Sequence, residues 1–410
     1  MCATILYHNK LQQICLTKGS SMTELQELRR YRRDLHRIPE LDFDLPQTIA
    51  YIEGVLVPLA CEVTHPCPSC VCAFFDAGVG AAHATAIRAD MDALPIAEAT
   101  GAAFASTHPG KMHACGHDGH MAMALAAATF VDRTIREQPG AIKRNVLFVF
   151  QPAEETFYGA QSIVDKGHLD DVMNFIAVHI ALSAENKPLP SHTVACGCRD
   201  FLSDRQLDVY LEGKAAHPCG ASQEGKNALL AACSAALNIH SIAPHEEGLC
   251  RVNVGEIHAG VCANTIAPDA MMRIEYRGQK PAISEYAGQR IFDILEGTAK
   301  AYDLKYHYVD YGEVPAGASD YAMMEVVQRA AKKVPWFQTV YFEGNVGGTD
   351  DAAVMLTKVQ QNGGIGSYVG IGADTTGPVH NPEFDFDEDC LQAAMELCVY
   401  ALEELHGMDA

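Results

Sequence analysis

This 410-residue sequence has little positive charge and no long apolar run. It contains 30 Lys and Arg residues against 52 Asp and Glu residues, which gives a formal net charge of −22. A surface with this excess of negative charge repels polyanions, so neither nucleic acid nor an anionic membrane surface is an expected partner. No stretch reaches the roughly 18 consecutive apolar residues of a membrane span. Residues 1–21 also lack the apolar core of a signal peptide.

Histidine and cysteine, in contrast, are plentiful, with 18 and 15 residues. Because fifteen is odd, at least one thiol must stay unpaired, and a chain of this length does not need disulfides to stabilise its core. We therefore expect a cytoplasmic protein whose cysteines and histidines are available for packing or for metal. The first helical pattern begins near Met22, which predicts a flexible tail over residues 1–21 and makes Met22 an alternative start.

The alternation of apolar runs with helical patterns predicts a layered α/β catalytic domain with a mostly parallel sheet. Strands are predicted at 85–90, 145–150, 175–178 and 367–371, and helices at 48–59, 120–137 and 350–361. Each of these strands is followed by polar side chains. Ligands bind at the carboxyl ends of the strands in such sheets, so we expect the functional site there.

The middle of the chain has a different pattern. Its predicted elements are a strand at 205–211, a helix at 227–242, strands at 251–257 and 270–276, a helix at 281–301 and a strand at 305–310. This β-α-β-β-α-β order is that of a ferredoxin-like α+β domain. We predict that residues 203–312 form an inserted lid or dimerisation domain, and that residues 22–202 and 313–410 form the catalytic domain.

Residues 112–120 (MHACGHDGH) place three His, one Cys and one Asp in a loop that leads into a predicted helix. Imidazole, thiolate and carboxylate groups are the ligands of borderline divalent metals, and a helix N-terminus favours the thiolate form of cysteine. Cys115 and His117 are therefore candidate metal ligands. The alternative is a polar loop that only caps the helix.

Glu154 and Glu155 follow the strand predicted at 145–150. Two adjacent carboxylates repel each other, so burial of both requires a strong positive charge nearby. A metal ion supplies this charge if one carboxylate is its ligand and the other acts as a general base. The alternative is a solvated acidic turn.

His179 ends an apolar strand, and His380 lies in a loop with Gly and Pro. Each histidine by itself is typical of ordinary packing. Together with the candidates above, however, they give five ligands from four loops at one edge of the sheet: Cys115, His117, Glu155, His179 and His380. That set is sufficient for two metal ions that share a bridging ligand and a water.

The predicted insertion contributes His217, which follows a strand, and Asn264. The functional interpretation is a donor pair that polarises an oxyanion when this domain, or its copy in a partner protomer, closes over the metals. The alternative is that each is a turn residue bonded to its own backbone.

A cysteine-rich segment supports a competing hypothesis. Cys67 and Cys70 have CxxC spacing and are flanked by Cys61 and Cys72, which suggests a redox pair or half a zinc site. No second CxxC motif follows, so thiols that pack as small apolar groups are the default interpretation.

These motifs resemble the metal-dependent amidohydrolases related to aminoacylase and carboxypeptidase G, in the branch of hippurate hydrolase, the auxin-conjugate hydrolases and aminobenzoyl-glutamate hydrolase. The similarity is carried by residues 32–40 (RRDLHRIPE), 88–95 (RADMDALP), 112–120, 151–155 (QPAEE), 213–217 (GKAAH) and 380–382 (HNP). Within that branch, residues 224–232 and 251–255 are most similar to the aminobenzoyl-glutamate hydrolases. One departure is residues 348–351 (GTDD), where the family usually has Gly-Ser-Glu-Asp.

The resemblance implies a dinuclear site for zinc or manganese, with cobalt or nickel possible, bound by the five ligands above. It implies that Glu154 is the general base, that Asp92 orients a metal ligand, and that His217 and Asn264 contribute to the pocket. The expected reaction is hydrolysis of the amide bond of an N-acyl or N-aroyl amino acid, in a homodimer or with a homologous partner chain. The alternatives are a metal-dependent dipeptidase or aminopeptidase, and a non-catalytic component of a heteromeric amidohydrolase.

Overall fold

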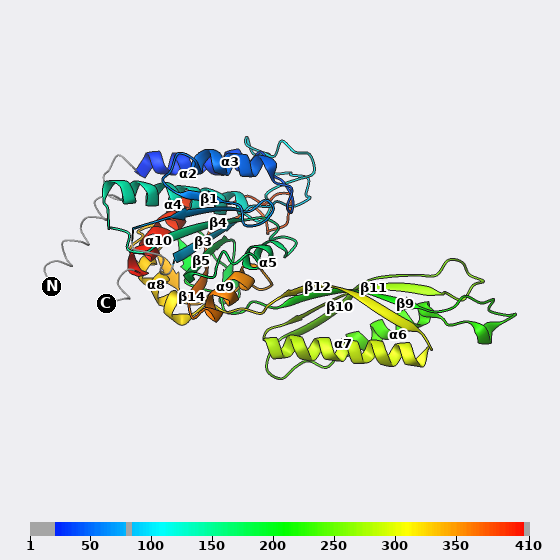
Figure 1. The fold of residues 1–410 in the computed structure, drawn as a ribbon. Coiled ribbons are helices and arrows are strands. Elements are labelled where there is room, and N and C mark those ends of the chain that lie inside the picture. Colours follow the sequence, from blue (N-terminus) through cyan, green and yellow to red (C-terminus); the bar gives the residue numbers. More distant parts are fainter. Residues whose placement is uncertain (1–20, 79–83, 406–410) are drawn as a thin grey trace. The chain divides into compact units, whose positions relative to one another are not determined.

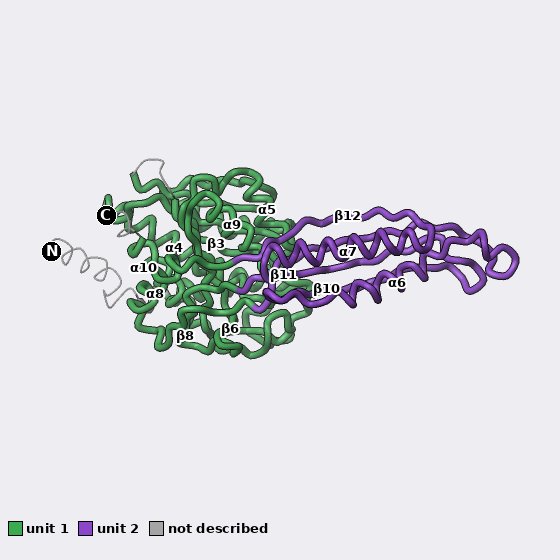
Figure 2. The backbone as a smooth tube through the Cα atoms, turned by 90° about the horizontal axis from the view of Figure 1, so that it is seen from below, with its two compact units in different colours: residues 1–199, 318–346, 350–410 green, residues 200–317, 347–349 purple. Residues whose placement is uncertain are grey.

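The computed structural model describes residues 21–78 and 84–405, so the tail predicted for residues 1–21 lies outside the described residues except for Ser21. The chain divides into two compact units (Figure 2). Unit 1 comprises residues 1–199, 318–346 and 350–410, and unit 2 comprises residues 200–317 and 347–349.

Unit 1 is built on an eight-stranded sheet with the order β1-β2-β4-β3-β5-β14-β8-β13. Its strands are β1 (Glu62–Thr64), β2 (Val71–Phe75), β3 (Ala84–Asp90), β4 (Val146–Gln151), β5 (Val172–Ile180), β8 (Thr193–Ala195), β13 (Thr339–Tyr341) and β14 (Ile365–Ile371). The four central strands β4, β3, β5 and β14 run parallel to one another. Almost every residue of these four strands is buried, as expected for strands covered on both faces.

Helices cover this sheet (Figure 1). They are α2 (Ser21–His36), α3 (Pro46–Leu56), α4 (His117–Glu137), α5 (Gly159–Val164), α8 (Tyr321–Ala331), α9 (Ala352–Gln361) and α10 (Cys390–Leu405). One hydrophobic cluster joins α2, α3, α4, α8 and α10 to the sheet. Helix α9 packs on β5 and β14 outside that cluster, with α5 beside it. The layered α/β fold predicted from the sequence is confirmed.

Two helix boundaries differ from the prediction for identifiable reasons. Helix α3 occupies Pro46–Leu56 rather than 48–59, because the Glu40 carboxylate accepts the N–H groups of Gln47 and Thr48 in its first turn. Helix α4 begins at His117 rather than residue 120. Gly116 precedes it with φ of +91°, a left-handed conformation that favours glycine and lets the chain turn sharply into the helix.

Unit 2 has the predicted β-α-β-β-α-β order. Its elements are β9 (Asp204–Glu212), α6 (Ala228–His240), β10 (Cys250–Ala259), β11 (Asp269–Gly278), α7 (Pro281–Ala301) and β12 (Lys305–Val314). The strands form an antiparallel sheet of order β10-β11-β9-β12, and the apolar faces of α6 and α7 pack on it in a core of their own. This is the ferredoxin-like topology.

Three short elements complete the described chain: the two-stranded sheet of β6 (Ser183–Ala184) and β7 (Lys187–Pro188), and a 3₁₀ turn at Ser222–Glu224. Among the residues that the structure describes, no helix is long and apolar enough to cross a membrane.

Candidate metal centre

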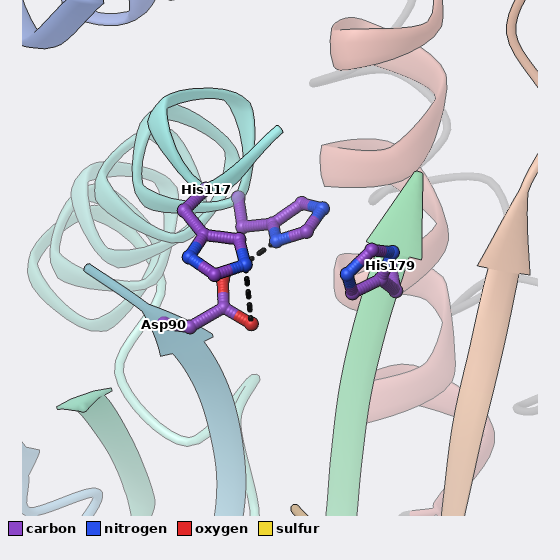
Figure 3. A group of neighbouring side chains, drawn as sticks. Asp90, His117 and His179 are labelled. Atoms are coloured by element: carbon purple, nitrogen blue, oxygen red, sulfur yellow. Dashed lines mark hydrogen bonds and ion pairs between the residues drawn. The ribbon is translucent and has the colours of Figure 1, made fainter. Parts of the chain in front are cut away.

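The carboxyl ends of the parallel strands converge on one buried group of side chains. Asp90 is the last residue of β3, His117 is the first residue of α4, and His179 is the penultimate residue of β5. All three side chains are buried, and they point toward one another (Figure 3). This is the location that the parallel sheet predicts for a ligand.

His117 presents one ring nitrogen to the centre of this group. Its Nδ1 lies 2.8 Å from the backbone carbonyl oxygen of Asp92 and donates its proton there. Nε2 is buried and has no hydrogen-bond partner. Burial lowers the pKa of His117 to about 3, so the ring is neutral and the Nε2 lone pair is available to a cation. A metal ligand held by a second hydrogen bond in this way has a fixed tautomer and orientation.

His179 is oriented in the same manner. Its Nδ1 donates to the carbonyl oxygen of Ile180, and Nε2 lies 3.6 Å from Sγ of Cys115. Burial lowers the pKa of His179 to about 4, so this ring is also neutral. The thiol and the two imidazoles therefore direct their available ligand atoms to a common region.

Glu155 lies close to Cys115 and His117, and His380 lies close to Glu155. Ligand atoms of Cys115, His117 and Glu155 all lie within 4.8 Å of one another, and Nε2 of His380 is 3.4 Å from Oε2 of Glu155. Glu155 Oε1 is buried without a hydrogen-bond partner. Burial and nearby carboxylates, Asp92 first among them, raise the pKa of Glu155 to about 8. A divalent cation at this position would stabilise the ionised form of Glu155 against burial and the nearby carboxylates, so the residues present fit a bound metal.

Glu154 faces the same group and its backbone is fixed by Asp92. The Asp92 carboxylate accepts the N–H groups of Glu154 at 2.9 Å and Glu155 at 3.1 Å. Oε2 of Glu154 lies 3.7 Å from Nε2 of His117. Burial and the neighbouring carboxylate of Asp350 raise the pKa of Glu154 well above its usual range. Glu154 is therefore a basic carboxylate beside the candidate ligands, which is the placement of a proton acceptor.

Sequence reasoning did not assign a role to Asp90 or His120, although both lie in the cluster. His120 Nδ1 donates to Asp90 Oδ1 at 2.6 Å, and His120 Nε2 accepts the N–H of Ile180 at 3.0 Å. Both nitrogens of His120 are thus occupied, so we do not count it as a ligand. The spacing of His117 and His120, three residues apart on one helix face, was the signal that they lie side by side.

Arg88 forms a second group that the sequence did not reveal. Its wholly buried guanidinium lies 2.6 Å from Asp90 and 3.2 Å from both Asp350 and Asp351. Tyr368 donates its hydroxyl proton to Asp350. The shorter acid of the GTDD stretch is thus an ion-pair partner of Arg88, and this network supports the carboxylate side of the centre.

The two candidates from the insertion lie in unit 2 and are described within it. The exposed ring of His217 accepts the N–H groups of Cys219 and Gly220 at Nδ1, at 3.2 and 3.1 Å. Its Nε2 therefore carries the proton of the neutral ring and can donate it. Asn264 is exposed, and its Oδ1 accepts from the thiol of Cys262 at 3.3 Å.

The cysteine-rich segment lies apart from these groups, around strand β2. Cys67, Cys70 and Cys72 are buried, with Sγ atoms of Cys70 and Cys72 3.8 Å apart. No group of three metal-binding side chains within the described residues includes them. The geometry agrees with thiols that pack in the core.

Comparison with known proteins decides the family. The model of the peptidase family M20/M25/M40 matches residues 86–404. The chain belongs to this family. An indole-3-acetyl-aspartic acid hydrolase of Enterobacter agglomerans is 37% identical over 76% of this chain and 71% of its own length. A p-aminobenzoyl-glutamate hydrolase subunit from Escherichia coli K12 is 35% identical, over 86% of this chain and 78% of that protein.

A solved M20 structure agrees. The YXEP protein of Bacillus subtilis, described as a dinuclear metal-binding peptidase, is 26% identical and superimposes with a TM-score of 0.76, covering 95% of this chain and all of that one. As an M20 family member with buried side chains that could hold metal ions, the chain is a metal-dependent hydrolase of amide bonds.

Proposed function

We propose that the chain hydrolyses the amide bond of an N-acyl amino acid with two divalent metal ions bound by Cys115, His117, Glu155, His179 and His380. The observation that carries this proposal is the convergence of these ligand atoms from four loops. Two of them, Nε2 of His117 and Oε1 of Glu155, are buried with no hydrogen-bond partner. A buried polar atom without a partner is costly, and a bound cation supplies the missing interaction.

Five ligand groups are sufficient for two ions. Cys115 lies close to His117, His179 and Glu155, and His380 lies close to Glu155. Imidazole and thiolate ligands suit zinc, while the carboxylate also suits manganese, and cobalt or nickel can occupy such a site. We propose zinc or manganese as the natural ions.

Bound ions would supply Lewis acidity and lower the pKa of a water molecule at the centre. Glu154 takes the proton of that water as it attacks the amide carbonyl, and later returns it to the leaving amine. Asp92 holds the backbone of Glu154 in place for both transfers. His217 donates from Nε2 to the developing oxyanion, and Asn264 binds the substrate.

Replacing His217 by Ala should lower kcat/KM by about 10²–10³-fold, because one oxyanion donor is lost. Metal affinity should not change, since His217 is not among the ligand atoms. The matched control is His258→Ala in the same unit, where an exposed imidazole pairs with Glu256. Steady-state kinetics with metal content measured on each variant tests this. Equal kcat/KM in the His217 and His258 variants would refute the oxyanion role.

The substrate class is inferred from the relatives. The substrates in the names of these relatives, indole-3-acetyl-aspartic acid and p-aminobenzoyl-glutamate, each join an acyl group with an aromatic ring to an acidic amino acid. We propose an amide of the same kind here. A net charge of −22 does not oppose such an anionic substrate, because two divalent ions dominate the local field.

A hydrolysis screen tests this proposal. The metal-reconstituted protein is given hippurate, aminobenzoyl-glutamate, N-acetyl amino acids and dipeptides, and free amine is measured. The proposal expects the highest kcat/KM on an aromatic acyl conjugate of glutamate or aspartate. Preference for free-amine dipeptides would favour the dipeptidase or aminopeptidase alternative. No turnover by this chain alone, with metal bound, would favour a non-catalytic component that requires a homologous partner.

We further propose a dimer, of two copies or with a homologous partner chain, in the cytoplasm. The Escherichia coli relative is named as one component of a hydrolase with several chains, and unit 2 exposes apolar side chains such as Leu237 and Val261, which are 76% and 81% exposed. Among the described cysteines, none is joined in a disulfide, in agreement with a reducing compartment. Analytical ultracentrifugation of the purified chain distinguishes monomer from dimer.

A further inference from the structure

A buried ion network lies next to the candidate ligands and has no part in the proposed reaction. Arg32, near the end of α2, is 1% exposed, and its Nε donates to Oδ2 of Asp118 at 3.1 Å. His36 Nδ1 lies 2.7 Å from the same oxygen. Asp118 is the residue directly after His117 and is wholly buried. Two basic side chains of α2 therefore fix the residue adjacent to a candidate ligand.

The other nitrogens of Arg32 reach the C-terminal loop. Nη2 of Arg32 pairs with Asp385, and Nη1 lies 3.1 Å from Oε1 of Glu388. The guanidinium carbon lies 3.9 Å from the centroid of the Phe386 ring. The same loop, between β14 and α10, contains His380. One buried guanidinium thus joins the start of α4, which carries His117, to the loop that carries His380.

The segment around Arg32 also holds the remaining loops on this side of the sheet. The N–H of Ala93 donates to the carbonyl oxygen of Glu40 at 2.8 Å, next to Asp92. The N–H of Ala153 donates to the carbonyl oxygen of Asp42 at 3.2 Å, directly before Glu154. Residues 32–42, which include the RRDLHRIPE motif, therefore contact the start of α4 and the loops after β3, β4 and β14.

The network is charged, and Arg32, His36 and Asp118 are buried in it. Burial lowers the pKa of His36, but hydrogen bonds to Asp118 and Glu98 outweigh burial and raise this pKa to about 9, so His36 is a cation at neutral pH. Buried charges are tolerated only when they are paired with good geometry. Lysine cannot replace Arg32 here, because a single ammonium cannot contact carboxylates in three directions and also stack on an aromatic ring.

We propose that Arg32 is a positioning residue that holds Asp118 and Asp385 at a fixed separation. Through these two contacts it keeps the loop of residues 115–117 aligned with His380, so that Cys115, His117 and His380 keep the spacing that two ions require. This inference rests on the proposed function, since it assumes that those residues bind metal.

The test is a metal titration of the full-length protein carrying Arg32→Lys. Dissociation constants for cobalt are measured by competition with a chelator, and the visible spectrum of the cobalt-loaded protein is recorded. We expect the more weakly bound ion to lose about 10–100-fold in affinity and the spectrum to change, as for other residues that orient metal ligands. The matched control is Arg30→Lys on the same helix, whose 60% exposed side chain pairs with Glu27 and should leave both readouts unchanged.

The outcomes separate the two proposals. If the unsubstituted protein binds no cobalt, the proposed function fails. If it binds two ions and Arg32→Lys binds them with the same affinities and spectrum, the positioning role is wrong and the proposed function stands. If Arg32→Lys does not fold, Asp385→Asn is the second variant. It removes the charge of Asp385 from the ion pair with Arg32, at a side chain that is 26% exposed. Unchanged cobalt binding in that variant would equally overturn the inference.

Discussion

Replacing Glu154 by Gln should lower kcat by about 10²–10⁴-fold or more while both metal ions stay bound. The side chain is buried, and its Oε2 lies 3.7 Å from Nε2 of His117. Glutamine keeps the shape of the side chain and the backbone N–H that donates to Asp92, but its amide cannot accept and return a proton. The measurement is kcat on the best substrate of the screen, together with metal content per chain.

The neighbouring residue gives the matched control. Glu155→Gln removes a proposed ligand instead of the proposed base, so that variant should lose bound metal and recover part of its rate when metal is added in excess. Near wild-type turnover of Glu154→Gln with two ions bound would show that another group moves the proton. Equal loss of metal from both variants would contradict the separate roles of the two carboxylates.

The parts of the fold that the sequence predicted are those set by local pattern. Helix α7 spans Pro281–Ala301, as predicted, because proline starts the helix and the apolar spacing continues to its end. The start of α4 was placed three residues too late, because a loop rich in Cys, Gly and His has no helical periodicity. Only the left-handed turn at Gly116 shows where the helix begins.

The candidate site likewise contains some residues that local sequence patterns indicate and others that they do not. Glu155 and His179 follow strands that the sequence predicts, so the rule that ligands gather at strand ends points to both. Cys115 and His117 precede or begin α4, and only their residue types in that loop indicate them as candidate ligands. The supporting ion pairs were not predictable, since they join distant positions. Arg88 pairs with Asp350 across 262 residues, and Arg32 pairs with Asp385 across 353 residues. No local spacing signals such contacts.

The tautomers are a further property that only the structure supplies. His117, His120 and His179 look equivalent in the sequence. His117 and His179 each donate from Nδ1 to a carbonyl oxygen and keep Nε2 available, whereas His120 uses both nitrogens. The hydrogen bonds of the ring, and not its position in the motif, determine which histidine can bind metal.

Removing the metal ions with a chelator should abolish hydrolysis and destabilise the protein. The ions bind the folded chain, so at a free concentration 1,000 times Kd each contributes about 4 kcal/mol of stability that is lost on their removal. The measurement is activity and calorimetric melting before chelation, after chelation, and after separate addition of zinc, manganese, cobalt or nickel. Turnover by protein that is verified to be metal-free would contradict the mechanism.

The identity of the metal ion that best restores activity should depend on Cys115, because a thiolate favours zinc over manganese more strongly than oxygen ligands do. Cys115→Ser should therefore weaken zinc binding by more than manganese binding, and shift the metal preference of restored activity toward manganese. Cys233→Ser, an exposed thiol on α6, is the matched control and should leave the preference unchanged. An equal loss of both metals in Cys115→Ser would mean that the thiol packs beside the ions without binding them. Nε2 of His179 lies 3.6 Å from the sulfur of Cys115, so the thiol lies among the proposed ligands. We therefore expect the shift in metal preference.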